Sequence, residues 1–294
     1  MSLKKILRGT GVAIVTPFKK NMEVDYASLE HLIDHLVENK VEYIVSLGST
    51  GEAVTLSKEE MVDVVNCTYD RVNNRVPVVV GLAGNNTAEL IKSIDTLPLG
   101  KAAAILSSSP AYNKPTQAGI YQHYKIFAEA CPKPVILYNV PGRTSSNMTA
   151  ETTLKLAKEC KNIAGIKEAS GNMIQCMHIL KDCPPDFLVV SGDDHLALPL
   201  IALGMDGVIS VAANCFAKDF STMIRDVLNN NPDAKKIQYK LLDGMDLLFA
   251  ENNPAGLKCF LAEMGLIENV VRLPLVPVSD DLHQKIKDFI SKNK

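Results

Sequence analysis

The sequence predicts an α/β fold, a (β/α)8 TIM barrel followed by a C-terminal helical appendix. Three observations lead to this prediction: eight short apolar runs recur up to Val211, stretches with helical spacing separate them, and the pattern changes after Val211. Runs rich in Val, Ile and Ala are typical of parallel strands buried on both faces. Eight strand–helix units of this kind close into a barrel.

Most of the eight runs begin about 25–33 residues apart, which leaves room for a helix between them. An open, doubly wound sheet is the alternative, but it would favour a Gly-x-Gly-x-x-Gly turn after the first strand, which this sequence lacks. The predicted strands are Gly11–Thr16, Tyr43–Gly48, Val76–Gly81, Ala102–Leu106, Pro134–Asn139, Ile163–Lys167, Leu188–Gly192 and Gly207–Val211. The predicted helices between them include Ser28–Glu38, Lys58–Arg71, Thr87–Leu97, Gln117–Ala130, Ala150–Cys160 and His195–Leu203.

The C-terminal part of the chain reads as several helices without a strong strand. Asn252-Asn253-Pro254 is a turn that opens a predicted helix over Ala255–Met264. We therefore expect a barrel over residues 1–217 that carries the active site, and a helical region over residues 218–294 that packs on it.

Composition narrows the class of protein. The chain has 294 residues, of which 47% are hydrophobic and 22% charged, and its net charge is −2. This balance provides no basic surface for nucleic acid or for a membrane. No apolar run approaches the roughly 18 residues that span a bilayer, and Val12–Val15 is too short for the core of a signal peptide. We expect a cytoplasmic protein with seven reduced cysteines and no zinc framework.

Barrel active sites lie at the carboxyl ends of the strands, so the residues that follow each run are the candidates. Ile163–Lys167 ends in a lysine that apolar residues precede. Burial disfavours an ammonium group, and a neutral amine can attack a carbonyl. The competing interpretation is a lysine whose stem leaves the strand and places its ammonium in water.

Other strand ends carry further candidates. In Gly48-Ser49-Thr50-Gly51-Glu52, backbone N–H groups between glycines can bind a carboxylate, although a turn with a helix cap is equally compatible. Tyr138 can move protons beside an amine, or it is a core tyrosine. Arg143, after Pro141-Gly142, suits a substrate carboxylate or a surface ion pair. Tyr112 lies in a loop between prolines, where it serves a site or an oligomer contact.

Two patterns suggest metal ligands only weakly. Asp193-Asp194 is more typical of a helix cap. His31 and His35 have the spacing of metal ligands, but the glutamate of a His-Glu-x-x-His motif is absent.

Three motifs together resemble the dihydrodipicolinate synthase family, within the pyruvate-dependent class I aldolase superfamily that includes N-acetylneuraminate lyase. They are Gly-Ser-Thr-Gly-Glu at 48–52, Tyr-Asn-Val-Pro-Gly-Arg-Thr at 138–144 and Gly-Ile-Lys-Glu-Ala-Ser-Gly at 165–171, in the family's order. The resemblance runs from about Gly9 to the C-terminus. Arg143 and Ser191-Gly192-Asp193-Asp194 favour the synthases over the sialic acid lyases.

The resemblance implies a lyase that condenses pyruvate with L-aspartate 4-semialdehyde to 4-hydroxy-tetrahydrodipicolinate, in the diaminopimelate route to L-lysine. It implies that Lys167 forms a Schiff base with pyruvate and that Tyr138 donates and accepts protons. Thr50 and Tyr112 would complete a proton relay, with Tyr112 reaching in from a neighbouring subunit of a homotetramer, a dimer of dimers.

The resemblance also implies how the substrates bind. Ser49 and Thr50 would hold the pyruvate carboxylate, and Arg143 the carboxylate of the semialdehyde. Main-chain groups of Gly192 and Ile209 would complete the pocket. Because the intermediate is a covalent imine on Lys167, we expect no metal and no organic cofactor.

Two alternatives stay open. The first is a sister pyruvate-dependent aldolase, similar to N-acetylneuraminate lyase or acting on another 2-oxo acid. The second is a non-catalytic barrel that binds a 2-oxo acid, which the complete set of Lys167, Tyr138, Tyr112 and Thr50 disfavours.

A possible regulatory site departs from the family. Many bacterial synthases carry a lysine feedback site with two histidines and a tyrosine. Lys58, Met61 and Ala111 stand at those positions here, while Asn85 and Glu89 match. We therefore predict weak or no inhibition by lysine.

Overall fold

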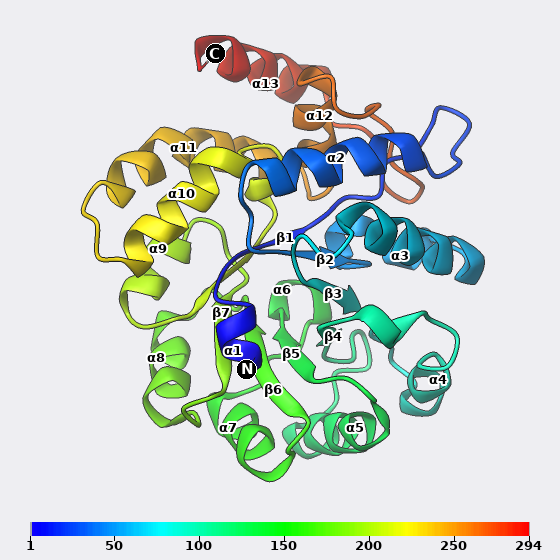
Figure 1. The fold of residues 1–294 in the computed structure, drawn as a ribbon, viewed down its shortest axis with the longest axis vertical. Helices are drawn as coiled ribbons and strands as arrows, with labels where there is room; N and C mark the ends of the chain where they lie inside the picture. The colour runs from blue at the N-terminus through cyan, green and yellow to red at the C-terminus, as the bar shows by residue number, and fades with distance from the viewer. Residues whose placement is uncertain (1, 294) are drawn as a thin grey trace.

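The protein folds into a closed barrel of eight parallel strands, described by a computed structural model over residues 2–293. The strands follow one another around the barrel in chain order, and the last pairs with the first (Figure 1). The predicted TIM barrel is thus confirmed. The strands are β1 (Gly9–Ala13), β2 (Tyr43–Ser46), β3 (Val78–Gly81), β4 (Ala104–Ser108), β5 (Val135–Asn139), β6 (Ile163–Glu168), β7 (Leu188–Ser191) and β8 (Gly207–Ser210).

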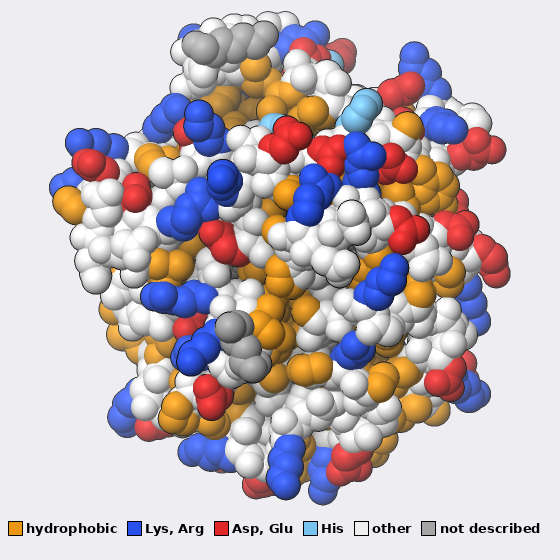
Figure 2. All heavy atoms as spheres, in the orientation of Figure 1, with side chains coloured by type: hydrophobic (Ala, Val, Ile, Leu, Met, Phe, Trp, Pro, Cys, Tyr) orange, Lys and Arg blue, Asp and Glu red, His pale blue; other side chains and the backbone are white. Residues whose placement is uncertain are grey.

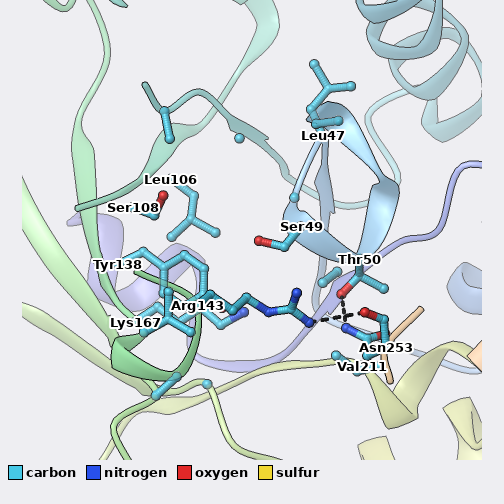
Figure 3. Close-up of a pocket in the computed structure, with 18 of the residues that line it drawn as sticks. Leu47, Ser49, Thr50, Leu106, Ser108, Tyr138, Arg143, Lys167, Val211 and Asn253 are labelled. Carbon is cyan, nitrogen blue, oxygen red and sulfur yellow. Dashed lines mark hydrogen bonds between the residues drawn. The ribbon is translucent and has the colours of Figure 1, made fainter. Parts of the chain in front are cut away.

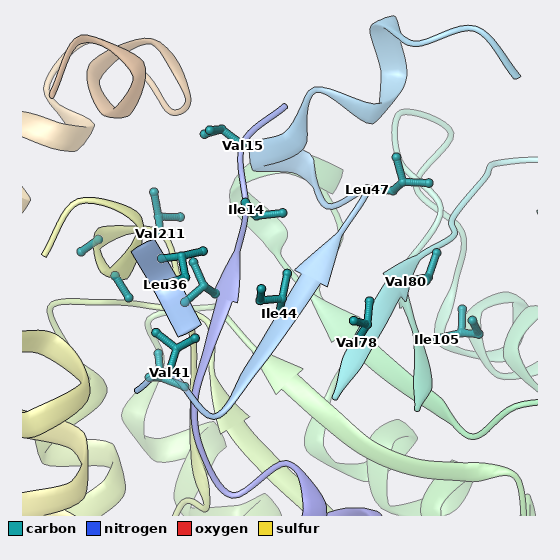
Figure 4. Packing of buried hydrophobic residues seen from close by; sticks show 14 of the residues in the cluster. Ile14, Val15, Leu36, Val41, Ile44, Leu47, Val78, Val80, Ile105 and Val211 are labelled. Carbon is teal, nitrogen blue, oxygen red and sulfur yellow. The ribbon is translucent and has the colours of Figure 1, made fainter. Parts of the chain in front are cut away.

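Both faces of the strands are buried, which explains why they read as continuous apolar runs. On one face, Ile44, Val78, Val80 and Ile105 belong to the main core cluster, part of which Figure 4 shows. Alternate residues belong to a second cluster, which includes Val45, Val79, Ile136, Tyr138, Val190 and Ile209. Since successive side chains of a strand point to opposite faces, the second cluster fills the barrel interior.

Helices surround the strands and continue beyond the last one. α10 follows β8 and packs against β1 and β8, α11 packs on α10, and α12 and α13 pack on α11 (Figure 1). The division into a barrel at 1–217 and a helical region at 218–294 stays a prediction. The helices are α1 (Leu3–Ile6), α2 (Tyr26–Glu38), α3 (Lys58–Val72), α4 (Thr87–Lys92), α5 (Gln117–Ala130), α6 (Pro141–Thr144), α7 (Ala150–Glu159), α8 (Met173–Asp182), α9 (Ala197–Ala202), α10 (Ala217–Leu228), α11 (Ala234–Phe249), α12 (Ala255–Glu263) and α13 (Asp280–Lys292).

One predicted helix is wrong in its second half. The sequence pattern predicted a helix over Thr87–Leu97, but α4 ends at Lys92. The Ser93 hydroxyl donates to the Glu89 carbonyl at 2.9 Å, and the Thr96 hydroxyl donates to the Ser93 carbonyl at 2.9 Å. Such local bonds compete with the helix and favour turns, and apolar spacing alone does not reveal them.

The molecular surface mixes charges of both signs. Figure 2 shows Lys and Arg side chains interspersed with Asp and Glu on the face where α1 lies over the barrel. Within residues 2–293, no helix combines the length and the apolar character that crossing a bilayer requires.

Candidate active site

A cavity of about 1060 Å³ opens at the carboxyl ends of the strands. Its wall brings together residues from β1, β3, β4, β5 and β6, from the loops after β2 and β7, and from the connection between α11 and α12, several of which Figure 3 shows. Six of the predicted site residues line it: Ser49, Thr50, Tyr138, Arg143, Lys167 and Gly192.

Lys167 and Tyr138 lie side by side at the floor of this cavity. They are register partners on β6 and β5, and the Lys167 Nζ atom lies 4.4 Å from the centroid of the Tyr138 ring. The lysine is only 5% exposed and the tyrosine 9%. A lysine that carries its ammonium out to bulk water would be far more exposed, so that alternative is wrong.

The carboxylate next to Lys167 in sequence does not pair with it. Glu168 points to the other face of β6, where Asn139 Nδ2, Gln175 Nε2 and the Ser170 N–H donate to its carboxylate at 3.0, 2.9 and 2.8 Å. Among residues 2–293, Lys167 takes part in no ion pair. The amine is therefore buried without a carboxylate beside it.

Gly192 leaves space for the stem of that lysine. A Cβ atom at this position would lie 2.8 Å from Lys167 Cε and 2.6 Å from Ala169 Cβ. Its N–H donates to the Glu168 carbonyl at 2.7 Å, which fixes the strand end. Glycine is therefore needed here for steric reasons, because any side chain would move Lys167; the role predicted for the main-chain groups of Gly192 stays a prediction.

The loop after β2 places two hydroxyls at the cavity. Ser49–Gly51 forms a single 3-10 turn, and Glu52 then adopts a left-handed conformation with φ +52°. The Thr16 hydroxyl donates to the Gly51 carbonyl at 2.7 Å and ties this loop to the end of β1. Ser49 is exposed towards the cavity, whereas Thr50 is buried in its wall (Figure 3).

Arg143 extends across the cavity from α6 (Figure 3). One of its terminal nitrogens donates to the Asn253 carbonyl at 3.2 Å. The guanidinium forms no ion pair with a carboxylate in the part of the chain that the structure describes. The surface ion pair considered from the sequence is therefore absent there, and the remaining N–H groups can bind an anion.

Two predicted site residues do not line the cavity of the single chain. Tyr112 is 91% exposed, in a loop after β4, and has a φ of +69°. The Ile209 side chain is buried in the barrel interior cluster with Tyr138 and Val190. The roles predicted for these two residues are taken up as proposals below.

Asp193 and Asp194 have different structural roles. The Asp193 carboxylate accepts from the Leu196 N–H at 3.2 Å, in the turn before α9. The helix cap predicted for this pair is wrong, because α9 begins at Ala197 and has no side-chain cap. Asp194 is buried, and its Oδ2 atom accepts from the Val211 and Ala212 N–H groups at 3.0 and 2.8 Å. Burial raises the pKa of Asp194. It joins the end of β7 to the turn after β8.

Asn253 contacts two of the predicted site residues, although no sequence motif marked it as part of the site. Its Nδ2 atom donates to Thr50 Oγ1 at 3.0 Å, and its carbonyl accepts from Arg143. The pattern identified Asn252-Asn253-Pro254 only as a helix start. One residue could have drawn attention to this region. Lys258 is a charged residue within the otherwise apolar stretch of α12, and a buried lysine needs a partner elsewhere in the fold.

Known proteins are similar to this chain in both fold and sequence. The chain is similar to the 4-hydroxy-tetrahydrodipicolinate synthase of Flavobacterium psychrophilum, with 49% identity over 282 residues and 96% of each chain covered. It is similar to the crystal structure of dihydrodipicolinate synthase from Aquifex aeolicus, with a TM-score of 0.94 and 39% identity over 97% of this chain and 98% of that one. A structure described as a monomeric dihydrodipicolinate synthase variant has a TM-score of 0.95 and 37% identity, and covers 99% of this chain and 98% of its own.

A model of the dihydrodipicolinate synthetase family matches residues 6–293. The family match and the full-length relatives agree with the three motifs and with the cavity they surround. The chain therefore belongs to the dihydrodipicolinate synthetase family.

Proposed function

We propose that this protein is a lyase that condenses pyruvate with L-aspartate 4-semialdehyde to 4-hydroxy-tetrahydrodipicolinate, in the diaminopimelate route to L-lysine. The observation that carries the proposal is Lys167, a buried amine without an ion-pair partner that lies beside Tyr138 in the cavity of a chain from this family. A buried amine in contact with a phenol is suited to covalent catalysis through an imine.

The proposed reaction needs no reagent beyond the two substrates. The Lys167 amine attacks the ketone carbon of pyruvate, and water leaves to give an iminium ion, which withdraws electrons from the methyl group. Loss of a methyl proton gives an enamine, whose carbon attacks the aldehyde of the second substrate. The amine of that substrate then attacks the iminium carbon, closes the ring and releases Lys167. This covalent route is why we expect neither a metal nor an organic cofactor.

Tyr138 is the proposed donor and acceptor for the protons of these steps, because its ring is in contact with the Lys167 amine. Thr50 and Tyr112 would extend the relay. Tyr112 is the exposed aromatic residue with the left-handed backbone, an arrangement often found at functional loops. We propose that it enters the cavity of a neighbouring copy in a homotetramer, a dimer of dimers.

The proposed carboxylate sites follow from the donors around the cavity. Ser49, Thr50 and their backbone N–H groups would hold the pyruvate carboxylate, close to Lys167. Arg143, further along the cavity, would bind the carboxylate of the semialdehyde. Main-chain groups of Gly192 and Ile209 would complete the pyruvate pocket.

Trapping with borohydride tests the covalent step. Reduction in the presence of pyruvate should add the mass of a reduced pyruvyl group to the peptide that contains Lys167 and abolish turnover. The same treatment without pyruvate is the control. Absence of the adduct from that peptide would reject the imine mechanism.

Turnover of two aldehydes separates this function from that of a sister aldolase. We expect rapid pyruvate-dependent consumption of aspartate semialdehyde and negligible consumption of N-acetylmannosamine, since Arg143 offers a site for a carboxylate that the sugar lacks. Preference for the sugar would point to the lyase branch of the superfamily. Pyruvate binding without turnover of either aldehyde would point to a non-catalytic barrel.

A further inference from the structure

The connection between α11 and α12 reaches the active-site cavity through Asn253. This residue is 5% exposed, and it lies against Thr50 at the side of the cavity (Figure 3). Its position in sequence is 203 residues from Thr50. The contact therefore depends entirely on how the C-terminal helices pack on the barrel.

α12 holds Asn253 in place. Lys258, fully buried in this helix, lies with its Nζ atom 2.5 Å from Glu52 Oε1 and 2.9 Å from the Val270 carbonyl. A Cβ atom on Gly256 would lie 2.4 Å from the Leu248 carbonyl, so the helix packs directly against the end of α11. The start of α12 thus contacts the loop after β2 twice, at Thr50 and at Glu52.

The hydrogen bond from Asn253 limits what the Thr50 hydroxyl can do. An amide NH2 group only donates, so Thr50 Oγ1 is the acceptor in the 3.0 Å contact. A hydroxyl carries a single hydrogen. With an N–H directed at its oxygen, Thr50 donates that hydrogen to a different acceptor, and the cavity is the side where a substrate carboxylate or a phenol oxygen would be.

We propose that Asn253 is a positioning residue that directs the Thr50 hydroxyl hydrogen into the cavity, towards the groups that move protons during the reaction. This inference rests on the proposed function, since a direction for that hydrogen matters only if Thr50 takes part in the chemistry. The Asn253 carbonyl also accepts from Arg143. The same residue therefore contacts both the relay and the proposed site for the semialdehyde carboxylate.

The opposite amide orientation gives a clear contrast. The Asn253 Oδ1 atom is buried and has no hydrogen-bond partner among residues 2–293. If the amide were reversed, Oδ1 would face Thr50, and the hydroxyl would donate to Asn253 and away from the cavity. An aspartate at this position has the same shape but, when ionised, only accepts. It would impose that second arrangement.

Asn253→Asp and Asn253→Ala therefore test the proposal, with kcat and the KM for pyruvate measured for each. We expect kcat to fall about a hundredfold in N253D and about tenfold in N253A, because aspartate reverses the hydroxyl whereas alanine only frees it. Lowering the pH should restore part of the N253D activity, relative to the wild type, as its carboxyl gains a proton to donate. If N253D is as active as N253A or more so, Asn253 serves only for packing or has the reversed orientation, and the proposal is overturned.

Two controls separate the effect of the Thr50 hydroxyl direction from the effects of an added charge and of a failure to fold. Asn252→Asp adds the same charge at the neighbouring position, and a loss of kcat equal to that of N253D would overturn the proposal. Should N253D fail to fold, chemical rescue of N253A decides the question. Acetamide, which can donate, should restore turnover at least threefold more than acetate, which cannot; equal effects would again overturn it.

Borohydride trapping on the wild-type protein distinguishes a failure of this inference from a failure of the proposed function. If borohydride traps no pyruvate on Lys167 of the wild type, the proposed function itself fails. If the adduct forms and the N253D and N253A variants behave alike, the imine mechanism stands and only the role of Asn253 is rejected.

Discussion

The two buried lysines, Lys167 and Lys258, have similar burial and opposite surroundings. Both are nearly inaccessible, at 5% and 0% exposure, and both amines lie over an aromatic ring, at 4.4 Å from the Tyr138 centroid and 4.0 Å from that of Phe18. Lys258 is 2.5 Å from the Glu52 carboxylate and donates to the Val270 carbonyl. Lys167 forms no ion pair within residues 2–293 and opens onto the cavity.

The difference teaches that burial alone does not make a lysine a nucleophile. Burial lowers the pKa of Lys258 to about 8, although the attraction of Glu52 opposes the shift. Because its amine is enclosed and paired, it stabilises the contact between α12 and the loop after β2. Lys167 has access to a substrate and no carboxylate to occupy it, which is what an imine-forming amine requires.

Replacing Lys167 by methionine should remove activity, whereas the same replacement of Lys258 should lower stability. Lys167→Met should lower kcat by roughly ten thousandfold, because the reacting nitrogen is lost. The free energy of unfolding should not decrease, since methionine fills a similar volume without a polar group to bury. Steady-state turnover and urea unfolding measure the two effects. Substantial residual turnover would remove Lys167 from the mechanism.

Lys258→Met should instead weaken the fold. It leaves the Glu52 carboxylate buried without its partner, which costs about 3–5 kcal/mol of unfolding free energy. The folded fraction should still form the pyruvate adduct on Lys167. Adding Glu52→Gln removes the isolated charge and should recover part of the stability. A stable K258M protein that fails to form the adduct would show that the two lysines have been assigned the wrong roles.

The pH dependence of stability sharpens the comparison further. The pKa of Lys258 is about 8 in the native protein, below its ordinary value of 10.5. Between these values the unfolded chain binds more protons at this position, so the native state gains stability as pH rises. Relative to the E52Q/K258M double variant, the wild type should gain up to about 3 kcal/mol across this range. Urea unfolding at pH 7.5, 9 and 10 would check the sign, and a falling difference would contradict it.

Gly192→Ala tests how closely Lys167 is held. The added methyl group would lie 2.8 Å from Lys167 Cε, so the stem of the lysine must move. A displacement of about 1 Å at a reacting group can cost a hundredfold, and we expect a loss of that size in kcat. Gly171→Ala is not a suitable control, because its φ is +69°. Gly100→Ala is the better one, since the added methyl group meets no atom within 4 Å and Gly100 does not line the cavity. Equal activity of G192A and the wild type would show that the position of Lys167 is tolerant.

A third lysine, Lys58, gives the smallest expected effect. Lys58 lies close enough to Glu89 to help lower the pKa of that carboxyl, after the larger contribution of Lys92. The Asn85 side chain already accepts from the Ala111 N–H at 2.8 Å. We therefore expect millimolar free lysine to leave turnover nearly unchanged in a steady-state assay. Half-inhibition at micromolar lysine would contradict this.

Much of the barrel and its floor could be predicted from local patterns. The eight apolar runs match the eight strands to within about two residues at most ends, because burial on both faces leaves a direct signature in the sequence. Lys167 and Tyr138 stood out because each ends such a run. The length of α4 was missed, since side-chain bonds of Ser93 and Thr96 compete with a helix that the apolar spacing favours.

The sequence by itself determined the strand–helix order, the strand ends that carry the chemistry and the family to which the chain belongs. Only the tertiary structure decided which lysine is paired and which is free, and that Asn253 contacts Thr50. The physical reason is distance along the chain. Periodicity and motifs report on neighbours in sequence, whereas Glu52 with Lys258, and Thr50 with Asn253, meet across some two hundred residues through the packing of α12 on the barrel.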